Sequence, residues 1–319
     1  MRYPARSVST QVLAERFRLD ERIGRGAMGD VWAATDLQTG EPVAVKLARG
    51  LAATDEALRE RFSLEGKVLR RIRSPHVCAL VDAGRAADGA LYMVLERLHG
   101  ETLEALLERV GFLPLEEVGR IADEVLQALI VAHAAGVVHR DLSPANIFLH
   151  TARDGTPVTK VVDFGVAKAD DLVASVTLPG TTLGSLPFVA PEQLGDASRA
   201  GSRADLYALG SIVFRALSGQ MPYGEARGTA LMTLKRAHDP PTIDEATGET
   251  WPAALRAFLV KSMARTPSKR YGSAEIARAA LREAVRGKGP RLAVPEGARG
   301  VGRTLTLDES PAGRPRGER

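Results

Sequence analysis

The chain has 319 residues, of which 45% are apolar and 26% are charged, so it is neither an intrinsically disordered chain nor a disulfide-rich secreted scaffold. No apolar run approaches the ~18 residues of a membrane helix, and only one cysteine, Cys78, is present, so we predict a cytoplasmic globular protein without a membrane span. Of the net charge of +4, residues 288–319 carry +3 (seven basic and four acidic side chains). The rest of the chain is thus nearly neutral, and nucleic-acid binding is not expected.

The first hundred residues are predicted to be rich in strands. Residues 1–16 form a polar N-terminal extension without the apolar segment of a signal peptide. Short runs with β-type composition predict strands over residues 17–24, 29–35, 41–47 and 91–95. Between them, apolar residues recur at a helical period over residues 55–72.

The remainder of the chain is predicted to be helical as far as residue 286. An amphipathic stripe runs through residues 115–135, and further helices are expected over 203–217, 251–263 and 273–285, the last opened by Ser273 as its N-cap. Residues 287–319 are rich in Gly, Pro and Arg, show no periodicity and are predicted to be a disordered tail. A small strand-rich lobe is therefore followed by a larger helical one.

A glycine-rich sequence, Gly-Arg-Gly-Ala-Met-Gly, occupies residues 24–29 between the first two predicted strands. Gly24, Gly26 and Gly29 have no Cβ, so their backbone can approach phosphates closely and donate N–H groups to them. In dinucleotide-binding folds the same spelling leads from a strand into a helix, and an acidic residue follows about 20 positions later. Here it joins two strands and is followed by Val-Ala-Val-Lys at 43–46. This context favours a nucleotide-covering hairpin, with a plain turn as the alternative.

Three more motifs follow in order: His-Arg-Asp-Leu-Ser-Pro-Ala-Asn at 139–146, Asp-Phe-Gly at 163–165 and Ala-Pro-Glu at 190–192. With the glycine-rich loop and Lys46 they make up the signature set of protein kinases. From about residue 17 to residue 286 the chain therefore resembles a eukaryotic-like serine/threonine protein kinase of the bacterial type.

The resemblance implies an α+β, two-lobed kinase fold. The N-lobe, a small antiparallel sheet with one main helix, would cover residues 17–95, the hinge 96–98 and the helical C-lobe 99–286. The implied cofactors are ATP and Mg²⁺. The implied reaction moves the γ-phosphate to serine or threonine hydroxyls of protein substrates, which requires positioning and charge neutralisation more than covalent catalysis.

The family's catalytic roles map onto named residues of this chain. Lys46 would hold the α- and β-phosphates, paired with a carboxylate on the predicted helix over 55–72. Glu65 fits that role better than Glu60, which suits a solvated helix face. Asp141 would accept or orient the proton of the attacking hydroxyl.

Metal and nucleotide binding follow from the same motifs. Asn146 and Asp163 would hold Mg²⁺, since amide and carboxylate oxygens suit this ion. The nucleotide site would comprise the glycine-rich loop, Lys46, the backbone of the hinge and apolar residues above and below the adenine: Ile23, Gly24, Gly26, Gly29, Val31, Ala44, Glu96, Leu98 and Phe148.

Supporting residues are also implied by the resemblance. Asp205 matches the buried aspartate that anchors the catalytic loop, and Glu192 is expected to pair with Arg270. One departure stands out: Ser143 occupies the position at which serine/threonine kinases usually carry a lysine, so one cation is missing from the transition state.

Two other functions stay open from the sequence. A pseudokinase would bind nucleotide as a signalling scaffold, but such proteins usually lack a metal ligand or the catalytic aspartate, and this chain has both. A small-molecule kinase would share the metal and base residues but lack the Ala-Pro-Glu segment.

Regulation by phosphorylation is predicted for the segment between Asp163 and Glu192. Arg140 directly precedes Asp141, which in this family marks kinases whose activation loop is ordered by a phosphate. Autophosphorylation is expected, with self-association of two copies during the reaction, and a merely polar loop is the alternative. The candidate hydroxyls are Ser175, Thr177, Thr181 and Thr182, of which Thr181 and Thr182 are favoured.

Overall fold

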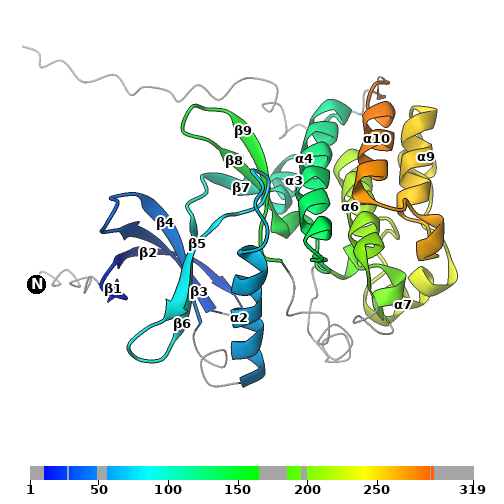
Figure 1. Cartoon of the computed structure of the whole chain (residues 1–319). Coiled ribbons are helices and arrows are strands. Elements are labelled where there is room, and N and C mark those ends of the chain that lie inside the picture. Colours follow the sequence, from blue (N-terminus) through cyan, green and yellow to red (C-terminus); the bar gives the residue numbers. More distant parts are fainter. Residues whose placement is uncertain are drawn as a thin grey trace, which may run out of the picture.

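The computed structural model describes residues 11–26, 29–48, 56–164, 185–194, 200–287 and 289–290. Figure 1 shows two lobes, a curled sheet with helix α2 beside it on the left and a helical body on the right. The two-lobed kinase fold predicted from the sequence is confirmed. No described helix is both long and apolar enough to cross a bilayer.

The N-lobe is built on a six-stranded antiparallel sheet, in the order β1-β2-β3-β4-β6-β5. Its apolar side chains alternate along the strands, and Phe17, Val45 and Val94 are fully buried between them. Helix α2 (Glu56–Leu69) packs Phe62 against Met93 of the sheet. The strands are β1 (Val12–Leu13), β2 (Phe17–Gly26), β3 (Gly29–Asp36), β4 (Pro42–Leu47), β5 (Leu80–Arg85) and β6 (Leu91–Glu96).

A second, three-stranded sheet lies where the lobes meet. It contains β7 (Gly100–Thr102), β8 (Ile147–Thr151) and β9 (Pro157–Val161) in that order. Helix α3 (Leu103–Val110) follows β7 directly, because the Thr102 hydroxyl accepts a hydrogen bond from the Ala105 N–H and so caps the first turn. This small sheet connects the catalytic loop to the Asp-Phe-Gly motif.

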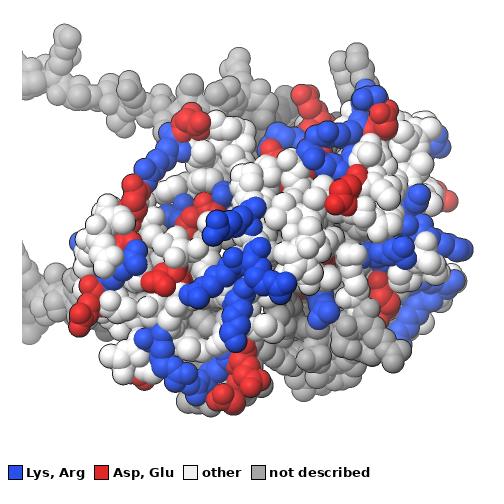
Figure 2. Space-filling model, viewed as in Figure 1, with Lys and Arg blue, Asp and Glu red and all other residues white. Residues whose placement is uncertain are grey.

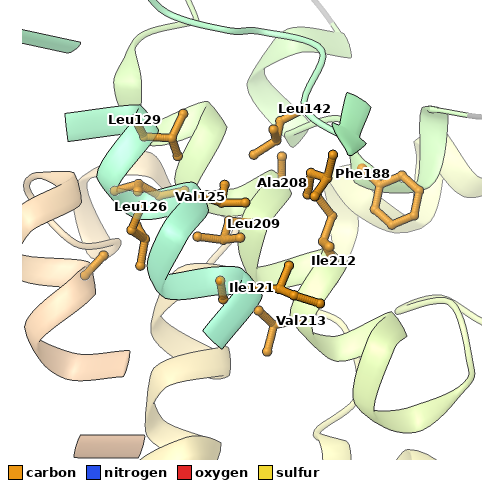
Figure 3. Close-up of a cluster of buried hydrophobic side chains, with 14 of the residues drawn as sticks. Ile121, Val125, Leu126, Leu129, Leu142, Phe188, Ala208, Leu209, Ile212 and Val213 are labelled. Carbon is orange, nitrogen blue, oxygen red and sulfur yellow. The ribbon is translucent and has the colours of Figure 1, made fainter. Parts of the chain in front are cut away.

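The helical body forms around two buried helices, α4 (Leu115–Ala134) and α6 (Ser202–Ser218). Figure 3 shows their facing side chains, among them Ile121 and Val125 of α4 and Leu209 and Ile212 of α6. A Cβ on Gly210 of α6 would lie 2.6 Å from Cβ of Ser262, so only glycine allows this approach. The outer helices are α7 (Gly228–Ala237), α8 (Ile243–Thr247), α9 (Ala253–Ser262) and α10 (Ala274–Ala284).

Every helix and strand predicted from the sequence is found, with ends that differ by at most three residues. Strands β1, β5 and β7–β9 and helices α3, α7 and α8 were not predicted from the sequence. Strand β1 belongs to the predicted N-terminal extension, yet it pairs with β2 and buries Leu13. The small lobe therefore begins before residue 17.

Candidate active site

The glycine-rich sequence forms the end of the β2–β3 hairpin, where Gly24 pairs with Val31 and Gly26 with Gly29. Gly29 has a φ of 142°, and a Cβ there would lie 2.0 Å from the Leu47 carbonyl oxygen. No other residue fits this position. The hairpin therefore runs directly beside strand β4, which carries Lys46.

Lys46 joins three elements of the cleft. Its Nζ donates to both carboxylate oxygens of Glu65 on α2, at 2.8 and 3.1 Å, and to Oδ1 of Asp163 at 2.9 Å. Burial opposes the charge on Lys46, but the carboxylates of Asp163 and Glu65 outweigh it and raise its pKa above the usual value. Glu60, the second candidate partner, is exposed on α2.

The catalytic loop is fastened to α6 through Asp205, which is 1% exposed. One carboxylate oxygen accepts the His139 N–H and the other the Arg140 N–H, both at 2.9 Å. The His133 ring on α4 lies 2.8 Å from the same carboxylate. Arg140 itself has a φ of 64°, a strained conformation for a non-glycine residue. These bonds fix the backbone that leads into Asp141.

Asp141 and Asn146 are held together within this loop. The Asn146 side-chain amide donates to the Asp141 carbonyl at 2.8 Å and reaches Oδ2 of its carboxylate at 3.3 Å. The Asn146 carbonyl in turn accepts the Val162 N–H at 3.0 Å, so the residue before Asp163 is tied to the loop. The side chain of Asp163 is 56% exposed beside Lys46. The candidate base, Asp141, and the candidate metal ligands, Asn146 and Asp163, therefore lie in one site.

Asn146 and Asp163 suit a magnesium ion that is bound together with phosphates. Mg²⁺ usually takes one or two protein oxygens and fills its octahedron with phosphate oxygens and water. No group of three or more His, Cys, Asp or Glu side chains among the described residues could hold a metal alone. The donor set therefore fits a shared protein–nucleotide site.

The residues expected around the adenine lie on strands of both sheets and in the segment between the two sheets. Ala44 is buried on β4, Val31 is half-buried on β3, and Phe148 is half-buried on β8. Ile23 is 42% exposed on β2. Leu98 follows β6 in the segment that joins the two lobes.

Glu96 has a side-chain contact that the sequence analysis missed. Its Oε1 accepts from Nζ of Lys160 on β9 and from the Ala79 N–H, both at 2.7 Å. This ion pair ties the start of the predicted hinge to the strand that precedes Asp163. The contact spans 64 residues, and no spacing rule in the sequence indicates it.

The Ala-Pro-Glu segment lies against the C-lobe. The Arg270 guanidinium donates to both oxygens of Glu192, at 2.6 and 2.7 Å, and is itself completely buried. Lys235 of α7, which the sequence did not single out, donates to the carbonyls of Pro187 and Val189 at 2.6 and 2.7 Å. Burial lowers the pKa of Lys235 well below the usual value. Both side chains fix the segment expected to face a substrate.

Ser143 is buried, 4% exposed, and precedes a single helical turn, Pro144–Asn146. Arg25 of the glycine-rich hairpin is mostly exposed, and its Nε lies 4.0 Å from Asp30 Oδ1. The four candidate phosphorylation sites, Ser175, Thr177, Thr181 and Thr182, lie outside the described residues.

Comparisons with known proteins agree with this geometry. The model of the protein kinase domain matches residues 17–281. Serine/threonine-protein kinase pkn3 of Myxococcus xanthus is 35% identical over 276 residues, which is 85% of this chain and 50% of that protein. Serine/threonine-protein kinase PknA of Mycobacterium tuberculosis is 35% identical over 267 residues, which is 82% of this chain and 59% of that protein.

A solved structure of a kinase domain is also similar to this chain. The PknI kinase domain of Mycobacterium tuberculosis matches with a TM-score of 0.66 and 27% identity, covering 86% of this chain and 98% of that one. The chain thus spans a whole solved kinase domain but only about half the length of the curated relatives it matches.

Proposed function

Because the chain belongs to the bacterial serine/threonine branch of the protein kinase family, we propose that it transfers the γ-phosphate of ATP to protein serine and threonine hydroxyls. The observation that carries this proposal is the position of Lys46, which bonds to Glu65 and Asp163 at once. That arrangement places the phosphate-binding cation beside the metal-ligand candidates.

Each residue has a separate task in the proposed reaction. Lys46 binds the α- and β-phosphates, and Glu65 keeps its ammonium group in place. Asn146 and Asp163 would hold Mg²⁺, which neutralises charge on the phosphate oxygens when bound. Asp141 orients the attacking hydroxyl and takes its proton, because its carboxylate is fixed by Asn146.

A protein substrate is supported by the segment around residues 185–194. Lys235 donates two hydrogen bonds to carbonyl groups of that segment, and Arg270 donates two to the carboxylate of its Glu192. A kinase that acts on a small molecule has no need of such a platform. The lone, buried Cys78 and the use of ATP support a cytoplasmic site of action.

The test is transfer of labelled phosphate from ATP to a generic protein acceptor in the presence of Mg²⁺. Label in phosphoserine and phosphothreonine is expected. Transfer only to small molecules would contradict the protein substrate. ATP binding without any transfer, under conditions in which an activating phosphate is also supplied, would identify a pseudokinase instead.

Replacing Ser143 with lysine is expected to raise kcat by about tenfold or more. A positive charge would then lie near the charge that develops on the transferred phosphoryl group, where a single donor is worth ~10²–10³ in rate. Steady-state kinetics with a peptide substrate measures the gain, with Ser143→Met as a control of similar length without the charge. An unchanged kcat would mean that another cation already serves, and Arg25→Ala would then be expected to lower the rate. Loss of activity with ATP binding retained would show that the site is built around serine.

Autophosphorylation is expected on Thr181 or Thr182, before Ser175 or Thr177. Among the described residues, Nε of Arg140 is buried without a hydrogen-bond partner, and a phosphate carrying about −1.5 to −2 charges would supply one. Transfer between two copies in the cytoplasm is the proposed route. Mass spectrometry of the active enzyme should find the phosphate on this segment. In the Arg140→Met variant, the phosphate should no longer change the rate of phosphoryl transfer. An active enzyme without modification of this segment would contradict the prediction.

A further inference from the structure

Gln193 directly follows the Ala-Pro-Glu motif, and its buried side chain is 2% exposed. Its Oε1 accepts a hydrogen bond from the Ala190 N–H at 3.0 Å, and its Nε2 donates to the Arg140 carbonyl at 2.8 Å. Ala190 belongs to the segment expected to face a protein acceptor, and Arg140 belongs to the catalytic loop. One buried amide group therefore joins these two parts of the chain.

The two partners of Gln193 require a side chain that accepts and donates at once. An N–H needs an acceptor and a carbonyl needs a donor, so a neutral amide fits, whereas a lysine or arginine can only donate. Lys235, Arg236 and Arg270 do donate to acceptors on residues 187–194. Figure 2 shows Lys and Arg on the surface around α7, at the right of the view. Gln193 thus makes a contact that these basic side chains could not replace.

The peptide between Arg140 and Asp141 is fixed on both sides by such contacts. The Arg140 N–H donates to Asp205, the Arg140 carbonyl accepts from Gln193, and the Asp141 N–H donates to Nδ1 of His139 at 3.3 Å. Arg140 has a φ of 64°, and a non-glycine residue keeps such a conformation only where its surroundings determine it. Gln193 holds the carbonyl of the peptide that leads directly into the candidate base.

We propose that Gln193 is a positioning residue for phosphoryl transfer, which ties the orientation of the Asp141 carboxylate to the placement of the acceptor segment. This inference rests on the proposed kinase function. Without the bond to the Arg140 carbonyl, the strained peptide can relax and turn Asp141 away from the attacking hydroxyl. Because a misplacement of about 1 Å can lower a rate by about 10²-fold, the loss should be measurable.

Replacing Gln193 with methionine tests this role, because methionine has a similar volume but forms neither strong bond. The kcat for a peptide acceptor should fall by about 10–10²-fold. The Kd for ATP should stay within about twofold, since the Lys46–Glu65 pair is untouched. The matched control is Gln127→Met, which removes an amide bond to Asp123 within α4 and should keep the wild-type kcat.

The Asp141→Asn background shows whether Gln193 acts through the base. If it does, adding Gln193→Met to Asp141→Asn should lower kcat by less than about threefold further, because the base is already lost. A merely structural role would lower kcat as much in this background as in the wild type, and that result would overturn the proposal. Wild-type kcat in Gln193→Met would overturn it as well. A wild-type protein that transfers no phosphate would contradict the proposed function instead.

The variant Gln193→Glu serves if Gln193→Met does not fold, since it keeps the volume and an acceptor for the Ala190 N–H. When ionised, its carboxylate cannot donate to the Arg140 carbonyl, whereas the protonated acid can. Its kcat relative to that of the wild type should therefore be lower at about pH 9 than at about pH 6. Wild-type kcat at both pH values would overturn the proposal.

Discussion

Replacing Asp141 with asparagine is expected to lower kcat by about 10²–10⁴-fold, the usual contribution of a positioned acid–base group. The amide has the shape of the carboxylate but cannot take the hydroxyl proton. The oxygen of the new amide can accept the hydrogen bond that the Asn146 side chain donates to Asp141 at 3.3 Å, so the loop should keep its fold. Steady-state transfer to a peptide and the midpoint of thermal unfolding are measured on the same preparation.

The control for Asp141→Asn is Asp163→Asn, because the two changes act on different steps. Asp163→Asn should raise the Mg²⁺ concentration needed for half-maximal rate, whereas Asp141→Asn should leave that concentration unchanged. Lys46→Met should abolish transfer and weaken ATP binding. Wild-type turnover in Asp141→Asn would contradict the assigned base.

Replacing Arg270 with leucine is expected to lower the free energy of unfolding by about 3–5 kcal/mol. The guanidinium is fully buried and donates to both oxygens of Glu192 and to the carbonyls of Arg203 and Ala264. Leucine would leave these acceptors without donors in a site with little water. The expected fall in Tm is roughly 10 °C for a domain of this size.

Two further variants distinguish the stabilising effect of the buried Arg270–Glu192 pair from that of an exposed ion pair. Arg109→Leu removes an exposed ion pair with Glu101 and should cost at most about 1 kcal/mol. The double variant Arg270→Leu with Glu192→Leu should recover part of the loss, since no carboxylate is then left alone. A loss for Arg270→Leu no larger than that for Arg109→Leu would show that this pair does not fasten the segment.

The candidate catalytic residues could be named from the sequence because the family's motifs are short and continuous. Each of Lys46, Asp141, Asn146 and Asp163 lies in the short motif that identifies it, and hydrogen bonds in the structure bring all four together in one site. These residues could be identified without knowing any contact between segments that are distant in the sequence.

Residues that act only through distant contacts were missed. Lys235 meets the Pro187 carbonyl across 48 residues, and Lys160 meets Glu96 across 64. In sequence each is an ordinary lysine, for which an exposed position is the usual expectation. Only the folded chain shows that Lys235 has no exposed surface.

The missed elements have a physical explanation too. Strands β7, β8 and β9 are three to five residues long and give too few alternations for a period of two to be seen. Helices α3 and α7 have eight and ten residues, close to the length at which helix and strand patterns are hard to separate. Tertiary packing, not local preference, stabilises elements this short: α3 buries Leu103 and Leu107 in the main core, and α7 buries Leu231 against Leu186 and Val189.

The attachment of the catalytic loop to α6 has a consequence for how its amide protons exchange with solvent. The N–H groups of His139 and Arg140 belong to a loop, yet both donate to Asp205, which sits on the most buried helix of the body. Such protons exchange only when the surrounding core opens, in contrast to those of ordinary loops. The residues that lead into Asp141 therefore open with the hydrophobic core of the large lobe. Movements of the N-lobe leave them in place.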